Sequence, residues 1–126
     1  MPRLVLWIAA VLFAAFGIAF ALAPHRLAAT VDIQLPTDTA VTDFVATYGG
    51  FQIGFAVFLG VCLRRPGRVR LGLLASGCAV AGFAVSRAVG ILLLRDVRPV
   101  LYGVLLFEAT AAAVAFWAAG RLEYRD

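Results

Sequence analysis

Residues 71–94 read LGLLASGCAVAGFAVSRAVGILLL, an apolar stretch that is interrupted by a single charge, Arg87. A helix of about 20 residues is long enough to cross the roughly 30 Å of hydrocarbon in a bilayer. Because lipid offers no hydrogen-bond partners, the backbone of such a stretch must satisfy its own polar groups, and it does so as an α-helix. The stretch therefore predicts a transmembrane helix.

Three further apolar stretches raise the predicted number of spans to four. Strands of a membrane barrel would need polar residues at alternate positions, and these stretches lack them. The only substantial loop covers residues 24–38 and is predicted to be external. The predicted helices cover, with rounded bounds, residues 4–23, 39–63, 71–94 and 100–119. We expect an all-α fold, an integral membrane four-helix bundle, with residues 1–126 as a single membrane domain.

The composition supports the same conclusion. The chain is 63% hydrophobic and 14% charged, whereas a soluble domain is about 45–50% apolar and about 25% charged. Its net charge of +4 does not indicate nucleic-acid binding, because the basic residues flank apolar stretches instead of forming a patch. All eleven basic residues are Arg, and this bias, with abundant Ala, Val and Gly, is typical of bacterial proteins from GC-rich DNA.

Arginines at the ends of the predicted helices indicate the orientation of the chain. With the N-terminus inside, the external segments carry only three of them, Arg26, Arg95 and Arg98. The cytoplasmic segments then carry seven: Arg3, Arg64, Arg65, Arg68, Arg70, Arg121 and Arg125. Because positive residues favour the cytoplasmic side of short loops, both termini are predicted to be cytoplasmic. We expect a multi-pass protein of the cell inner (cytoplasmic) membrane.

The first predicted helix allows a second interpretation. Arg3, the apolar core and the small residues around Ala21 and Ala23 resemble a secretory signal peptide with its cleavage site. However, the apolar stretch exceeds the usual core of about 7–15 residues, and Pro24 would directly follow a cut after Ala23, the second of the two candidate sites. These two features favour an uncleaved spanning helix.

Three polar side chains interrupt three different spans: Gln52, Arg87 and Glu108. At about 1.5 Å of rise per residue, each lies about 10–14 Å below the external surface. Tyr48 precedes Gln52 by one helical turn on the same face and is shallower. Because a charge in lipid is costly unless it faces the interior and pairs, we predict an Arg87–Glu108 ion pair. Tyr48 and Gln52 would satisfy its remaining donors and acceptors.

The residues alone leave three interpretations of this polar layer open. The ion pair can be structural and fix the register of two helices. The layer can instead be a polar pocket that binds a ligand or ion. Arg87 can also extend toward the external headgroups, since it lies within about two turns of the surface. Asp43 is either the rim of such a pocket or a charge favoured near a helix N-terminus.

Small residues recur at spacings that let helices approach closely in lipid. Gly50 and Gly54 form a GxxxG pair on the same predicted stripe as Asp43 and Thr47. Packing within one bundle is the favoured interpretation, and a dimer interface is the alternative. The residues with this predicted role are Gly49, Gly50, Gly54, Gly82, Ser86 and Gly90.

The sequence contains no catalytic signature: it has no HExxH, no GxSxG, no Walker glycine loop and no paired-cysteine motif. His25 is the single histidine and has no cysteine near it, so we predict no metal or haem site. No catalytic residue and no cofactor are predicted, and an enzyme is the less favoured reading.

One stretch resembles a known family. Asp43-Phe44-Val45-Ala46-Thr47-Tyr48-Gly49-Gly50 is similar to the Tyr-Gly-Gly signature of the domain of unknown function 4345 family. Pro24, Arg87 and Glu108 stand where the family has a helix-closing proline, an arginine late in helix three and an acid in helix four. The resemblance implies a small bacterial membrane protein with four helices, distantly similar to the DoxX-like group. It implies no activity.

Three function hypotheses follow. The favoured one is a non-enzymatic binding or accessory module that takes a lipid or small amphiphile in a polar intramembrane pocket. The second is an oligomeric transporter or channel subunit, since four helices without repeats would have to assemble to form a pathway. The third is a membrane enzyme that acts on a lipid or quinone. The expected partners are the bilayer, a lipid or amphiphile, and a membrane protein or a second copy.

Overall fold

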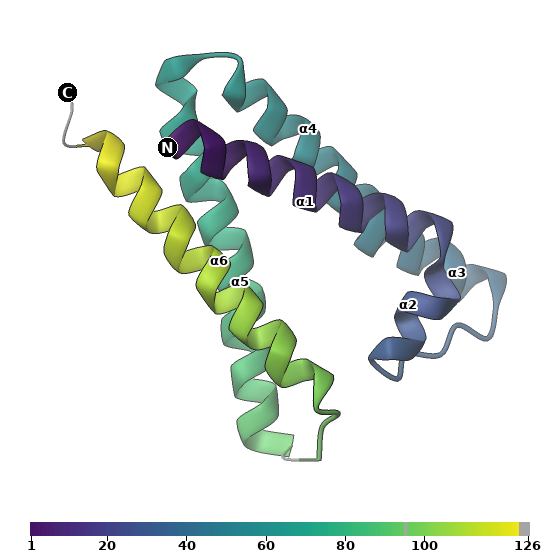
Figure 1. The fold of residues 1–126 in the computed structure, drawn as a ribbon. Coiled ribbons are helices and arrows are strands. Elements are labelled where there is room, and N and C mark those ends of the chain that lie inside the picture. The colour runs from purple at the N-terminus through teal and green to yellow at the C-terminus, as the bar shows by residue number, and fades with distance from the viewer. Residues whose placement is uncertain (95, 124–126) are drawn as a thin grey trace. The chain divides into compact units, whose positions relative to one another are not determined.

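The computed structural model describes residues 1–94 and 96–123 (Figure 1). Of this part of the chain, 88% is helical and none is strand, which confirms the all-α prediction. The elements in chain order are α1 (Pro2–Leu22), α2 (Pro24–Thr30), α3 (Asp38–Phe44), the π-helix η1 (Val45–Gly50), α4 (Phe51–Leu63), the 3₁₀-helix η2 (Pro66–Arg68), α5 (Val69–Leu94) and α6 (Val100–Glu123).

Four helical segments are long and apolar enough to cross a membrane, as predicted. They are Pro2–Leu22, Asp38–Leu63, Pro66–Leu94 and Val100–Leu122. The second is continuous through α3, η1 and α4, and α6 continues beyond the predicted end at residue 119. The cytoplasmic placement of both termini stays a prediction.

The expectation of a plain loop over residues 24–38 is wrong in its first half. Pro24 ends α1, but it is also the first residue of α2, a position where its fixed φ and missing N–H cost nothing. α2 buries Ala28 completely. The second half is irregular, and Thr37 then caps α3 by accepting a hydrogen bond from the Ala40 backbone N–H at 3.2 Å.

The chain divides into two compact units, and each is described by itself. One comprises Met1–Leu6 with Cys62–Asp126, and the other comprises Trp7–Val61. The single domain and the closed four-helix bundle stay predictions.

In the unit Trp7–Val61, α1 lies against η1 and α4 with their backbones in close contact (Figure 1). A Cβ atom on Gly17 would lie 2.9 Å from both the Gly49 carbonyl oxygen and the Ile53 backbone nitrogen. A Cβ on Gly49 would lie 3.2 Å from the Gly17 carbonyl oxygen. Only glycine fits at such an approach, which is how helices commonly associate in lipid.

In the other unit, α5 and α6 form an antiparallel pair joined by the short segment after Leu94 (Figure 1). The two helices meet through small side chains, and Gly77 on α5 makes room for the ring of Phe116 on α6. On α6 the buried residues are Glu108, Ala112, Ala115, Ala118 and Ala119. We call the contact between the two helices, formed by these residues of α6 and by Gly77 and Ala84 of α5, the α5–α6 seam.

Candidate functional site

The ion pair predicted from the sequence is present at the α5–α6 seam. The Arg87 Nε donates to Glu108 Oε2 at 2.9 Å, and Arg87 Nη2 donates to Glu108 Oε1 at 2.8 Å. The pair is therefore bidentate, a geometry that combines charge with two parallel hydrogen bonds. The side chain of Glu108 is 11% exposed and that of Arg87 is 25% exposed.

The register of the seam explains why these two residues meet. Glu108 precedes Ala112 by one turn on the buried face of α6, and Arg87 follows buried Ala84 by one turn on α5. The pair thus continues the line of small residues at a point where longer side chains can fill the space between the helices. A pair of this kind fixes how two helices align along their length.

The Tyr-Gly-Gly signature lies on the π-helix η1, which the sequence did not predict. Val45–Gly50 forms i→i+5 hydrogen bonds between the α-helical segments α3 and α4. A π-helix inside an α-helix is rare and occurs frequently at functional sites. Such a turn contains one extra residue, so positions after it are rotated relative to an uninterrupted α-helix.

This rotation changes which residues share a face. Phe44 and Gly49 are both buried although they are five residues apart, a spacing that the π-helix brings onto one side. The straight stripe predicted for Asp43, Thr47, Gly50 and Gly54 assumed a regular α-helix and is wrong for that reason.

Among the six residues predicted to pack between helices, Gly49 is the one in close contact with a neighbouring helix, α1, within its unit. A Cβ on Gly54, Gly82 or Gly90 would meet nothing within 4 Å, and one on Gly50 would approach only the Val45 oxygen, at 3.9 Å. Ser86 is exposed on its unit. A packing role for these five residues stays a prediction. Gly17 was not among the predicted packing residues, because its only signal in the sequence is a glycine within the apolar stretch of α1.

Three aromatic rings pack together at the start of the second span. Tyr48 stacks on Phe44 with ring centroids 4.5 Å apart, and Phe20 from α1 lies 5.7 Å from Phe44 and 5.6 Å from Tyr48. Phe44 is buried, whereas Tyr48 is 39% exposed. The cluster fixes the Tyr48 ring at its inner side and leaves part of it accessible.

A shallow hollow of about 430 Å³ lies beside this cluster. Its lining combines apolar and polar side chains: Ile33, Leu35, Ala40, Asp43, Phe44, Thr47 and Tyr48. The irregular segment before α3 supplies the first two, and α3 with η1 supplies the others. We call it the Tyr48 hollow.

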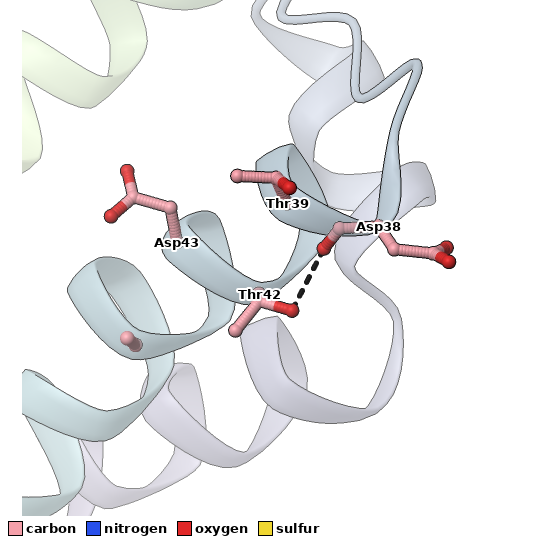
Figure 2. Close-up of a pocket in the computed structure, with 5 residues that line it drawn as sticks. Asp38, Thr39, Thr42 and Asp43 are labelled. Atoms are coloured by element: carbon pink, nitrogen blue, oxygen red, sulfur yellow. Dashed lines mark hydrogen bonds between the residues drawn. The ribbon is translucent and has the colours of Figure 1, made fainter.

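A second shallow hollow, of about 470 Å³, shares Asp43 with the first (Figure 2). Asp38, Thr39, Thr42 and Ala46 complete its lining. Thr42 Oγ1 donates to the Asp38 carbonyl oxygen at 2.7 Å, so this hydroxyl is already engaged. In Figure 2 the carboxylates of Asp38 and Asp43 point in opposite directions, which leaves Asp43 as the charge between the two hollows.

The predicted polar residues thus fall in two places. Arg87 and Glu108 pair in one unit, whereas Tyr48, Gln52 and Asp43 belong to the other unit. Gln52 is half-buried and does not line either hollow. One polar layer shared by all five residues stays a prediction. Among residues 1–94 and 96–123, no three His, Cys, Asp or Glu side chains gather as a metal site would require.

Comparison with known protein families assigns the chain to a family. The family described as Domain of unknown function (DUF4345) matches residues 1–119. The chain belongs to the DUF4345 family. The match includes η1, the Tyr48 hollow and the Arg87–Glu108 pair. No characterised protein and no solved structure is significantly similar to the chain. The distant similarity to the DoxX-like group stays a prediction.

Proposed function

We propose that this DUF4345 protein is a non-enzymatic membrane module that binds a small amphiphile or lipid in the Tyr48 hollow. The single observation that carries the proposal is the composition of that hollow. Ile33, Leu35 and Phe44 offer an apolar surface, and the Asp43 carboxylate and Tyr48 hydroxyl stand beside it. Ligand sites typically combine an apolar lining with a few polar groups that orient the ligand.

The geometry of η1 supports this placement. The π-helix turns Phe44 and Gly49 toward α1, where Gly17 contacts Gly49. Tyr48 is held by stacking on Phe44 and keeps an accessible surface. A ring that is fixed on one side is pre-organised, so less conformational freedom is lost when a ligand binds.

The Arg87–Glu108 pair has a supporting role in this proposal. Both oxygens of Glu108 accept hydrogen bonds from Arg87, so the carboxylate is engaged in the resting protein. The pair then holds α5 against α6 and provides a rigid frame for the module.

The experiment is native mass spectrometry of the full chain released from its own membrane. Asp43→Asn and Tyr48→Phe are compared with the wild type, and Thr39→Ala is the control, because Thr39 lines only the neighbouring hollow. We expect a defined extra mass on the wild type and the control, and at least about a tenfold loss of it in the two variants. A bare wild-type chain would contradict the proposal, and stable oligomers with ion flux would favour a transporter subunit instead.

We further propose that the protein lies in the inner (cytoplasmic) membrane with both termini in the cytoplasm. The distribution of arginines supports this orientation. In a chain with Cys62 and Cys78 replaced by Ala, Arg65→Cys should react with a membrane-impermeant maleimide only after the cells are opened. Arg26→Cys should react in intact cells, and the reverse pattern would contradict the orientation.

A further inference from the structure

One end of the unit that contains α5 and α6 gathers arginines from three separate segments of the chain. The N-terminal residues contribute Arg3, and the end of α6 contributes Arg121. The connection between α4 and α5 contributes the rest: Arg64, Arg65, Arg68 and Arg70. We call these six residues the arginine face.

Contacts within the unit bring these segments together. Arg3 Nη2 donates to the Leu63 carbonyl oxygen at 3.0 Å, which places the N-terminus beside the end of α4. Leu6 is buried where α5 begins, since a Cβ on Gly72 would lie 2.9 Å from its side chain. Because α6 runs antiparallel to α5, its last turn with Arg121 lies at the same end.

The guanidinium groups of Arg3 and Arg121 have intramolecular contacts that fix them in place. Arg3 donates a hydrogen bond to a carbonyl at the C-terminus of α4, where the helix dipole also favours a positive charge. The guanidinium of Arg121 lies 4.7 Å from the centre of the Trp117 ring, within reach of a cation–π contact.

Three other members, Arg64, Arg65 and Arg68, are exposed on a short and well-defined turn. The backbone N–H of Arg65 donates to the Cys62 carbonyl, and that of Arg68 donates to the Arg65 carbonyl. Pro66 begins the 3₁₀-helix η2 between them and fixes one φ angle. The turn therefore presents its guanidinium groups from a constrained backbone.

Within residues 1–94 and 96–123, little negative charge offsets this face. Among the described residues of the unit, the acidic ones are Asp96, Glu108 and Glu123. Asp96 lies at the opposite ends of α5 and α6, and Glu108 is paired with Arg87. Only Glu123 belongs to the same end as the six arginines.

We propose that the arginine face is a binding site for the phosphate headgroup of an anionic phospholipid in the surrounding bilayer. The face lies at the end of helices that are long and apolar enough to cross a membrane, and the headgroup phosphates would meet it there. Guanidinium groups match phosphate oxygens with two parallel hydrogen bonds, and basic pockets between spanning helices bind anionic headgroups. Trp117 beside Arg121 is the kind of side chain that sits at the same interface. The site is independent of the Tyr48 hollow.

The test compares two double variants that each remove two positive charges. Arg64→Gln/Arg65→Gln alters the arginine face, and Arg26→Gln/Arg98→Gln, in the segments predicted to be external, is the control with the same change of charge. Native mass spectrometry counts bound phosphatidylglycerol and phosphatidylcholine on the full chain in nanodiscs that contain both lipids equally. Circular dichroism in a neutral detergent checks that each variant is folded.

We expect the wild type and the control to retain phosphatidylglycerol in preference to phosphatidylcholine. The arginine-face variant should lose about thirtyfold in affinity, since each basic residue at a charged membrane surface contributes about a factor of five. Added salt should weaken the wild-type preference. Equal losses in both double variants, or no lipid preference in the folded wild type, would overturn the proposal. Either result would leave these arginines as orientation signals only.

Discussion

Among the described residues, polar side chains are paired at the α5–α6 seam and unpaired at the Tyr48 hollow. At the seam, each charged group has a partner: Arg87 binds Glu108 through two hydrogen bonds among buried alanines. At the hollow, Asp43 has no hydrogen bond or ion pair with a described residue, and Tyr48 has ring contacts only.

This difference separates two uses of polarity in a membrane protein. A charge that is satisfied internally stabilises one alignment of helices, while a polar group that faces an open hollow is available to a ligand. Substitutions in the two regions should therefore have different effects: loss of stability at the seam and loss of ligand at the hollow.

The largest effect is expected from breaking the ion pair on one side only. Glu108→Ala leaves the part-buried Arg87 guanidinium in the seam without its carboxylate, which should cost up to about 3–5 kcal/mol of unfolding free energy. The measurement is reversible unfolding in detergent, followed by circular dichroism. The double variant Arg87→Met/Glu108→Leu removes both charges and should recover most of the loss. If the single and double variants are equally unstable, the pair does not act as a unit.

A smaller effect is expected from filling the contact between α1 and η1. In Gly17→Ala the new Cβ would lie 2.9 Å from backbone atoms of Gly49 and Ile53, which cannot move independently. Such overpacking costs about 1–3 kcal/mol. Gly54→Ala is the control, because a Cβ there meets nothing within 4 Å and alanine is the better helix former. Equal stability of the two variants would show that the backbones do not meet as described.

An intermediate to small effect is expected at the end of α6. Trp117→Ala removes the ring beneath the Arg121 guanidinium, and this contact contributes about 0.5–1 kcal/mol at an exposed site. Trp117→Phe keeps a ring and should retain part of that energy. Thermal unfolding in lipid nanodiscs measures the difference, and identical transitions for alanine and phenylalanine would exclude a contribution from the ring.

The smallest effect on stability is expected at the hollow. Asp43→Asn and Tyr48→Phe remove polar atoms for which no described residue forms a hydrogen bond, so the unfolding free energy should change by less than about 0.5 kcal/mol. The same variants should lose the bound amphiphile. A large loss of stability in either one would assign it a structural role and remove the contrast with the seam.

The sequence allowed the ion pair to be predicted because its physical cause is local to the sequence. Arg87 and Glu108 stand at similar depths of two consecutive apolar stretches, and a charge in lipid requires a partner. The number and approximate positions of the spans could also be predicted, because a helix needs about 20 apolar residues to cross the hydrocarbon. Helix α2 was missed because Pro24 was taken as an end alone, although proline also begins helices.

Which face of each helix packs could not be predicted in the same way. A helix in lipid has an apolar environment on its outer side and an apolar partner on its inner side, so its hydropathy does not distinguish the two. That is why the glycines at the close contacts included Gly17, Gly72 and Gly77, none of which the spacing of small residues had indicated.

The sequence by itself determined the number of spans and the pairing of Arg87 with Glu108, because length and charge in an apolar medium have few solutions. Only the tertiary structure decided the π-helix at Tyr48 and the hollow beside it. Phe44 and Gly49 stand five residues apart, and an α-helix would point them to different sides. The close contact between Gly49 and Gly17 on the neighbouring helix α1 stabilises the π-helix with its extra residue. The sequence of residues 45–50 alone contains no pattern that predicts this contact.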